Sequence, residues 1–331
     1  MRVVIAPDKF KGTLTAAEAA DSMALAVRER WPDARIAVIP MADGGDGTLE
    51  ALGGANRRDT VTGPLGRPVE AAWRLDAGTA VIESAAASGL VLAGGTDAND
   101  PWAATSRGVG ELLALALDAD AARVLVGMGG SAMTDGGRGA LDALAARVPF
   151  APGRVVVLTD TTTAFTDAAR VFGPQKGADA AMVERLTARL ERDAAEWADR
   201  FGRDIRFEPR TGAAGGLSGA LSAAGAGVVD GAAYVAEVVG LAEALRGADL
   251  VLTGEGAFDA TSLAGKGPGH VLTLAAAAGV ATVAVAGTVA DDARGRGAVS
   301  VAEVVGIHRS LRQPAEALRV ATERALAGLG D

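Results

Sequence analysis

The sequence predicts an α/β protein in which a flavodoxin-like parallel-sheet domain carries an inserted mixed α/β domain. Strand-like and helix-like segments alternate at the start of the chain and again from residue 249 onward, as in a parallel sheet with helices on its faces. Between these parts, short β runs are joined by turn sequences at residues 63–66 and 76–78, which is typical of antiparallel hairpins. Such hairpins do not belong in a doubly wound sheet, so we expect a second domain with a mixed sheet.

A chain of 331 residues is long enough for two domains with ample hydrophobic cores. The flavodoxin-like domain is predicted to be discontinuous, over residues 1–54 and 231–331, and the insert to cover residues 55–230. The boundaries lie near Gly54 and Gly231. Two early and three late strands then form the five-stranded sheet.

The first elements can be placed by local signals. Residues 2–6 are an apolar β run followed by a loop that holds Asp8 and Lys11. Thr15 and Glu18 fit a capping box, which predicts a helix from residue 16 to 31, before a proline. A second strand, residues 35–40, leads into the next loop. Ligands sit at the carboxyl ends of strands in such sheets, so both loops are candidate binding segments.

The remaining elements follow from apolar periodicity and flanking turn residues. Further strands are predicted at residues 58–62, 68–75, 79–83, 123–126, 155–158, 249–252, 281–286 and 298–304. Further helices are predicted at residues 105–117, 138–146, 182–201, 231–246, 268–278 and 314–326.

Composition limits the classes of function. The chain is 49% hydrophobic and contains no cysteine, which excludes disulfides, thiolate nucleophiles and Cys-ligated metal centres. No signal-peptide pattern or membrane-length apolar run is present, so we expect a cytoplasmic protein without a membrane partner. A net charge of −9 argues against nucleic acid as a partner. The oligomeric state is not readable from the sequence, and a homo-oligomer is compatible with it.

Lysine is rare in this chain. It occurs four times, and the other 28 basic residues are arginine. A lysine retained against this bias is expected to serve as a compact point charge, the role that lysine has at phosphates. Lys11, Lys176 and Lys266 all lie in glycine-containing loops, so we take them as phosphate-binding candidates.

The loop at residues 42–48 (ADGGDGT) combines glycines with carboxylates between a strand and a helix. Gly44 and Gly45 allow the backbone to approach a ligand closely. Asp43 and Asp46 suit a Mg²⁺ ion, or a proton acceptor beside one. The helix that follows points its free N–H groups at the loop, which favours an anion there. An ordinary strand-to-helix turn has a similar composition, and this alternative stays open.

Two further glycine-rich loops, at residues 127–137 and 211–216, can wrap a phosphate through their backbone N–H groups. The first lacks the G-x-G-x-x-G spacing, which argues against a dinucleotide-dependent dehydrogenase. For the first loop, packing against its neighbour is the alternative. The candidate ligands in these loops are Gly129, Gly130, Ser131, Gly215 and Gly216.

Polar residues at other strand and helix ends complete the candidate set. Ser106 is expected to cap the helix that begins beside it. Arg107 is unusual in a first helical turn, and a bound anion would explain it. Asp160 follows the strand at residues 155–158, where an Asp is well placed for catalysis or for metal. Lys176 is presented by a tight turn.

With these motifs assembled, the chain resembles the bacterial class I glycerate kinase family. The resemblance implies ATP-dependent phosphorylation of D-glycerate, usually to 2-phosphoglycerate, with Mg²⁺. It also implies an active site in the cleft between a flavodoxin-like domain and its insert. The matching segments lie in the expected order at residues 5–13 (IAPDKFKGT), 42–48, 105–108 (TSRG), 127–132 (GMGGSA), 172–178 (FGPQKGA) and 253–256 (TGEG).

Phosphoryl transfer requires mainly positioning and charge neutralisation, and the candidate residues can supply both. Asp160 is the first choice as acceptor of the hydroxyl proton and Asp46 the second. Asp43, Asp46 or Glu255 would hold Mg²⁺. The phosphates and the glycerate carboxylate would be neutralised by Lys11, Arg107, Lys176 and Lys266, with Asp8 close by in the first loop.

The chain also departs from the family pattern. Residues 160–165 (DTTTAF) stand where the family usually has DVTNPL, and a longer family segment between residues 146 and 155 is missing. Formation of 3-phosphoglycerate, or a non-catalytic anion-sensing role on the same scaffold, are therefore the alternatives.

Overall fold

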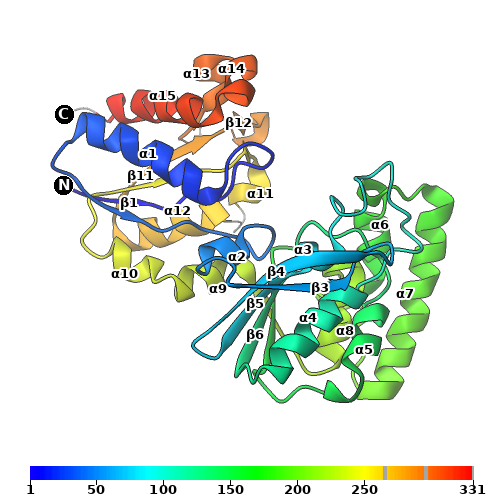
Figure 1. Ribbon diagram of the computed structural model, residues 1–331. Coiled ribbons are helices and arrows are strands. Elements are labelled where there is room, and N and C mark those ends of the chain that lie inside the picture. Colours follow the sequence, from blue (N-terminus) through cyan, green and yellow to red (C-terminus); the bar gives the residue numbers. More distant parts are fainter. Residues whose placement is uncertain (264–266, 294–296, 330–331) are drawn as a thin grey trace. The chain divides into compact units, whose positions relative to one another are not determined.

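The structure is a computed structural model that describes residues 1–263, 267–293 and 297–329. The chain forms two compact units, one of residues 1–43 and 232–331, and one of residues 44–231. We call them the flavodoxin-like unit and the inserted unit. Figure 1 shows both, with the two segments of the flavodoxin-like unit in blue and in yellow to red.

The flavodoxin-like unit is built on a five-stranded parallel sheet with strand order β13-β11-β9-β1-β2. Two strands come from the start of the chain and three from its end, in the flavodoxin-like order, which confirms the predicted fold class. The strands are β1 (Arg2–Ile5), β2 (Arg35–Val38), β9 (Leu250–Thr253), β11 (Ala281–Ala286) and β13 (Ala298–Ser300).

Helices cover both faces of this sheet (Figure 1). Helix α1 (Ala16–Arg30) packs against α15 (Pro314–Ala327) on one face, and α10 (Leu241–Leu245) and α12 (Gly267–Ala278) lie on the other. The predicted capping box is present, because Thr15 Oγ1 accepts from Glu18 N and the Glu18 carboxylate accepts from Thr15 N. The unit also contains α9 (Gly231–Val238), α11 (Ala260–Leu263), α13 (Val301–Val305), α14 (Ile307–Arg312) and the strand pair β10 (Ala257–Phe258) and β12 (Thr288–Val289).

Two predicted elements end earlier than their apolar patterns suggest. The helix predicted at residues 231–246 is divided into α9 and α10 at Gly240, whose φ is 71°. The strand predicted at residues 298–304 ends at Ser300, because its hydroxyl accepts from Glu303 N and caps α13. A local backbone signal overrides the apolar run in both cases.

The inserted unit contains a six-stranded mixed sheet with strand order β3-β4-β5-β6-β7-β8. The first three strands are antiparallel neighbours, and β5 to β8 pair in parallel. The predicted hairpins are therefore present. The strands are β3 (Arg57–Thr62), β4 (Pro68–Asp76), β5 (Thr79–Glu83), β6 (Arg123–Gly127), β7 (Val155–Thr159) and β8 (Gly227–Asp230).

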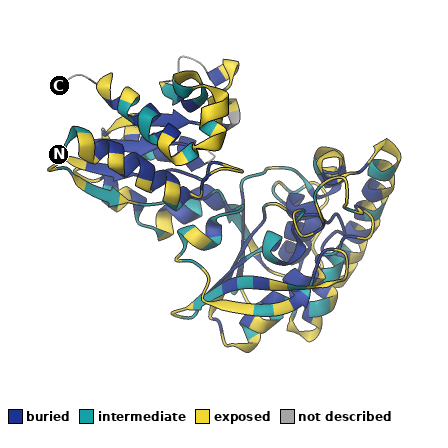
Figure 2. Cartoon of the chain, turned by 45° about the horizontal axis from the view of Figure 1, so that its top comes forward, coloured by how far each residue is buried: buried dark blue, intermediate teal, exposed yellow. Residues whose placement is uncertain are grey.

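The helices of the inserted unit bury their apolar stripes on this sheet, as the dark inner faces in Figure 2 show. Helix α7 contributes Leu186, Leu190 and Trp197, each fully buried. The helices are α2 (Thr48–Ala51), α3 (Ser84–Ser88), α4 (Arg107–Asp118), α5 (Arg138–Leu144), α6 (Ala168–Phe172), α7 (Ala180–Phe201) and α8 (Leu217–Ala223).

The first division between the units falls after Asp43, before the Gly54 boundary proposed from the sequence. The loop that begins at Gly44 and helix α2 pack on the strands of the inserted sheet. Gly44 O accepts from Met128 N at 2.7 Å, and Leu49 N donates to the Glu83 carboxylate at 2.8 Å. No described helix is both long enough and apolar enough to span a bilayer.

Candidate active site

Two of the predicted glycine loops meet at the carboxyl ends of β6 and β7. Gly44 has a φ of 90°, and a Cβ there would lie 2.7 Å from the carbonyl carbon of Leu158. A Cβ at Gly129 would lie 2.5 Å from Gly45 Cα. The glycines are therefore required for the close approach of the two loops, as well as for any approach to a ligand.

Asp46 lies at this junction. Gly130, with a φ of 61°, comes so close that a Cβ would lie 2.6 Å from Asp46 Oδ1. That oxygen is buried and has no hydrogen-bond partner among the described residues. A buried carboxylate oxygen without a donor calls for an explanation, and a bound cation would supply one.

Lys176 lies in the same unit and is almost completely buried, with 3% of its surface exposed. Its ammonium group donates to Ser131 Oγ at 3.0 Å and to Met133 O at 2.7 Å. Burial lowers the pKa of Lys176 from 10.5 to about 7, and the negative charge of Asp135 acts in the opposite direction. The structure thus brings Lys176 and Ser131 together, with the ammonium bonded to the glycine loop itself.

Asp135 is a buried carboxylate that joins the starts of α4 and α5. Its Oδ2 accepts from Ser106 N at 2.7 Å, from Ser106 Oγ at 2.8 Å and from Gly139 N at 3.2 Å, and its Oδ1 accepts from Gly137 N at 3.1 Å. Two helix N-termini therefore share one negative charge, which is favourable there. From the sequence, Asp135 could be placed in a glycine-rich loop, but its hydrogen bonds to Ser106 could not be predicted, because the two residues are 29 positions apart.

Ser106 does not cap α4 with its side chain, in contrast to the sequence expectation. Its hydroxyl donates to Asp135 and accepts from Ala140 N at 3.0 Å instead. Arg107 needs no anion to explain its place in the first turn, because its side chain is half-exposed and pairs with Glu111 at 2.9 Å. Both residues keep a phosphate-binding role only as a prediction.

Gly215 and Gly216 are buried and lie against the loop that follows β6. Gly215 O accepts from Gly136 N at 3.1 Å, and Gly216 has a φ of 92°. Close packing requires glycine at both positions, and the phosphate-binding role of this pair stays a prediction.

Asp160 follows directly after β7 and is half-buried. Beside it, Arg210 donates to Thr159 O at 3.0 Å and forms an ion pair of 2.9 Å with Asp230, at the end of β8. Sequence reasoning missed Arg210, since nothing near it in the chain points to the sheet edge. A guanidinium is thus fixed at the strand ends where Asp160 lies.

The flavodoxin-like unit has its own charged group at the carboxyl ends of β1 and β2. Lys9 Nζ lies 3.6 Å from Asp8 and 3.7 Å from Asp43. Burial raises the pKa of Asp8 from 3.8 to about 6, the charge of Lys9 lowers it, and that of Asp43 raises it. Lys9, which the sequence analysis did not select, bridges two of the predicted residues.

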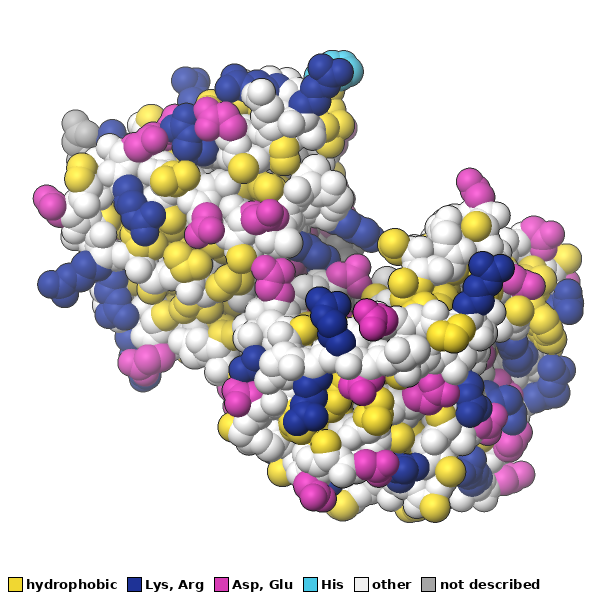
Figure 3. Space-filling model, in the orientation of Figure 1, with side chains coloured by type: hydrophobic (Ala, Val, Ile, Leu, Met, Phe, Trp, Pro, Cys, Tyr) yellow, Lys and Arg dark blue, Asp and Glu magenta, His cyan; other side chains and the backbone are white. Residues whose placement is uncertain are grey.

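Of the other predicted residues in this unit, Lys11 is exposed on the loop after β1. Glu255 follows β9, and its backbone O accepts from Gly287 N at 3.0 Å. Lys266 lies outside the described residues. On the face seen in Figure 3, basic and acidic side chains are intermixed, so an anion would meet net positive charge there only locally.

The described residues contain no group of three carboxylate or histidine side chains that could hold a metal ion. The unpartnered Oδ1 of Asp46 fits a single protein ligand of an ion that is otherwise bound by water and phosphate oxygens. This is the coordination that Mg²⁺ usually has beside nucleotides.

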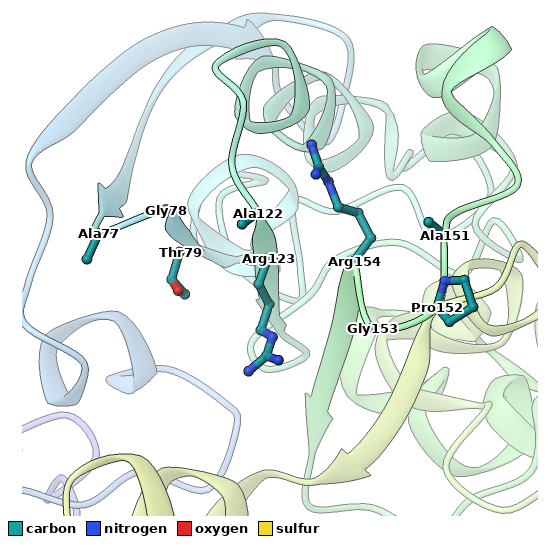
Figure 4. A pocket seen from close by; sticks show the side chains of 9 residues that line it. All are labelled: Ala77, Gly78, Thr79, Ala122, Arg123, Ala151, Pro152, Gly153 and Arg154. Atoms are coloured by element: carbon teal, nitrogen blue, oxygen red, sulfur yellow. The ribbon is translucent and has the colours of Figure 1, made fainter.

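A cavity of about 460 Å³ lies at the opposite edge of the inserted sheet, at the amino ends of β5, β6 and β7 (Figure 4). It is lined by residues 77–79, 122–123 and 151–154. None of the predicted site residues is among them, so this cavity is distinct from the glycine loops.

Comparison with known proteins identifies the class. The family model for the glycerate kinase family matches residues 3–162 and 150–327. Glycerate 2-kinase of Escherichia coli (strain K12) is 38% identical over 330 residues, which cover 88% of this chain and 86% of that protein. Glycerate kinase of Bacillus subtilis (strain 168) is 37% identical with the same coverage.

A solved structure agrees with these matches. The crystal structure of a protein assigned as glycerate kinase 2 from Salmonella typhimurium LT2 superposes with a TM-score of 0.80 and 34% identity, covering 99% of this chain and 98% of that one. Fold and relatives together define a phosphotransferase of the α/β class. The chain belongs to the glycerate kinase family, as the resemblance predicted.

Proposed function

We propose that this kinase transfers the γ-phosphoryl group of ATP to D-glycerate and forms 2-phosphoglycerate in the cytoplasm. The observation that supports this best is the junction of two glycine loops at Asp46, whose buried Oδ1 lacks a partner among the described residues. The similarity to the glycerate 2-kinase of Escherichia coli favours the 2-phosphorylated product.

In this proposal the protein contributes positioning and electrostatics. The backbone of Gly129 and Gly130 lies against the phosphates. Ser131 Oγ, which accepts a hydrogen bond from Lys176, donates its own hydrogen to an anionic oxygen. The role of Lys176 is thus exerted through Ser131, since the ammonium is buried.

The proton of the attacking hydroxyl passes to the Asp160 carboxylate, with Asp46 as the alternative acceptor. The new O–P bond forms as the bond between the γ-phosphorus and the bridging oxygen breaks, and ADP leaves. Mg²⁺, held by Asp46 and the phosphates, would neutralise charge that develops on the phosphate oxygens. Asp43 and Glu255 remain the alternative ligands of Mg²⁺, and Lys11 remains a candidate for neutralising the phosphates.

The test is a coupled assay of ADP release with D-glycerate, followed by phosphorus NMR of the product. We expect turnover and the signal of the 2-phosphate. Asp160→Asn is expected to lower kcat by about two to four orders of magnitude while the circular dichroism spectrum is unchanged. Near-normal turnover of this variant would exclude Asp160 as the base.

The same assay decides between the alternatives. A 3-phosphate signal would leave the kinase activity and correct the product. Stabilisation by ATP or D-glycerate without any turnover would instead identify an anion-sensing protein. This alternative is tested because residues 160–165 differ from the usual family sequence.

A further inference from the structure

Asn99 lies on the loop between α3 and α4, a segment that carries none of the predicted site residues before Ser106. Its side-chain amide donates to two backbone carbonyls, Lys176 O at 2.8 Å and Ala132 O at 3.1 Å. These carbonyls belong to segments more than forty positions apart in the chain, the turn that carries Lys176 and the glycine loop after β6.

The hydrogen bonds close a ring. Lys176 Nζ donates to Ser131 Oγ and Met133 O, and Asn99 donates to the carbonyls of Lys176 itself and of Ala132, which lies between those two partners. Thr96 on the same loop adds a hydrogen bond to Gln175 O at 2.9 Å. The distance between the ammonium group and the serine hydroxyl therefore depends on an amide that touches neither group.

The two contacts of the Asn99 side chain require an uncharged group with two hydrogen-bond donors. Two carbonyl oxygens face one NH₂ group, and only an amide of this length supplies two donors without charge. The isosteric aspartate would replace the donors by an oxygen anion that faces two carbonyls, which is repulsive.

We propose that Asn99 is a positioning residue, which fixes the Lys176–Ser131 pair for phosphoryl transfer by joining the backbones that carry them. The catalytic part of this inference, that the positioning serves phosphoryl transfer, rests on the proposed function. Its structural part, that Asn99 keeps Lys176 in its buried place, is independent of any activity.

The first experiment measures the structural part. The four lysines are few enough for each to be followed by mass spectrometry after brief treatment of the intact protein with acetic anhydride. Lys176 is buried in the wild-type protein, so we expect it to be protected. In Asn99→Asp we expect its acetylation to rise by about tenfold or more, because local opening exposes the amine.

The second experiment measures the catalytic part. A displacement of catalytic groups by about 1 Å can lower the rate by about 100-fold, so we expect kcat of Asn99→Asp to fall by about 10- to 100-fold. Asp97→Asn is the matched control, an exchange of the same size at an exposed position of the same loop. It is expected to leave both labelling and kcat unchanged.

The outcomes separate the two parts. Wild-type protection of Lys176 in Asn99→Asp would overturn the inference, and so would increased labelling with an unchanged kcat. If the wild-type protein does not phosphorylate D-glycerate, the proposed function and the catalytic part fail together, and labelling alone decides whether Asn99 holds Lys176. Should Asn99→Asp fail to fold, Asn99→Ser, which is small and uncharged, is measured in the same two ways.

Discussion

Replacement of Lys176 by methionine is expected to change how stability depends on pH. The folded state favours the neutral amine, since burial lowers its pKa from 10.5 to about 7. Between these values the unfolded chain binds more protons at this residue, so the group makes the free energy of unfolding increase with pH. Integration from pH 7 to pH 9 gives an increase of about 2 kcal/mol that Lys176→Met lacks.

Urea titrations at pH 7, 8 and 9 measure this difference, with tryptophan fluorescence as the signal. Three of the four tryptophans, Trp73, Trp102 and Trp197, lie in the inserted unit, so the signal reports mainly on the unit that contains Lys176. Lys11→Met is the control, because Lys11 is exposed and should give the wild-type pH dependence. If the free energy of unfolding of Lys176→Met changed with pH as much as that of the wild type, the reasoning that burial makes the amine neutral would be refuted.

Three further substitutions test the site. Gly130→Ala introduces a Cβ at positive φ beside Asp46 Oδ1 and should destabilise the protein by about 1 to 3 kcal/mol, measured by thermal unfolding. Ser106→Ala removes the hydroxyl between Asp135 and α5, and a loss of about 1 to 3 kcal/mol is expected in urea titrations. Asp8 has a raised pKa, so the wild type should lose stability relative to Asp8→Asn as the pH rises from 4 to 6; a constant difference would contradict the burial of its charge.

The fold could be predicted because its signals are local. Alternating apolar strands and helices can be recognised from short stretches of sequence, and the hairpin turns indicate a second domain with a mixed sheet. The division after Asp43 has no such local signal. The loop from Gly44 is covalently continuous with β2 but packs on β6 and β7, and that preference depends on glycine contacts such as Gly44 with Leu158.

The residues of the candidate site also fall into those with a local sequence signal and those without one. Glycine loops and strand-end carboxylates have composition signals, so Asp46, Gly130 and Ser131 could be selected from the sequence. Asp135 and Arg210 act through partners that are distant in the chain, and no spacing rule finds such pairs. Their roles become visible only when the sheet has brought the loops together.

The structure shows what two of the four rare lysines contact, which the sequence could not show. Lys9 lies on the loop after β1 and pairs with two carboxylates, whereas Lys176 lies in the turn after α6 and donates to a hydroxyl and a carbonyl of the loop after β6. An arginine in place of the buried Lys176 would require a larger cavity and could not lose its proton. In both places lysine acts as a compact donor that holds a loop, and anion binding by these loops stays a prediction.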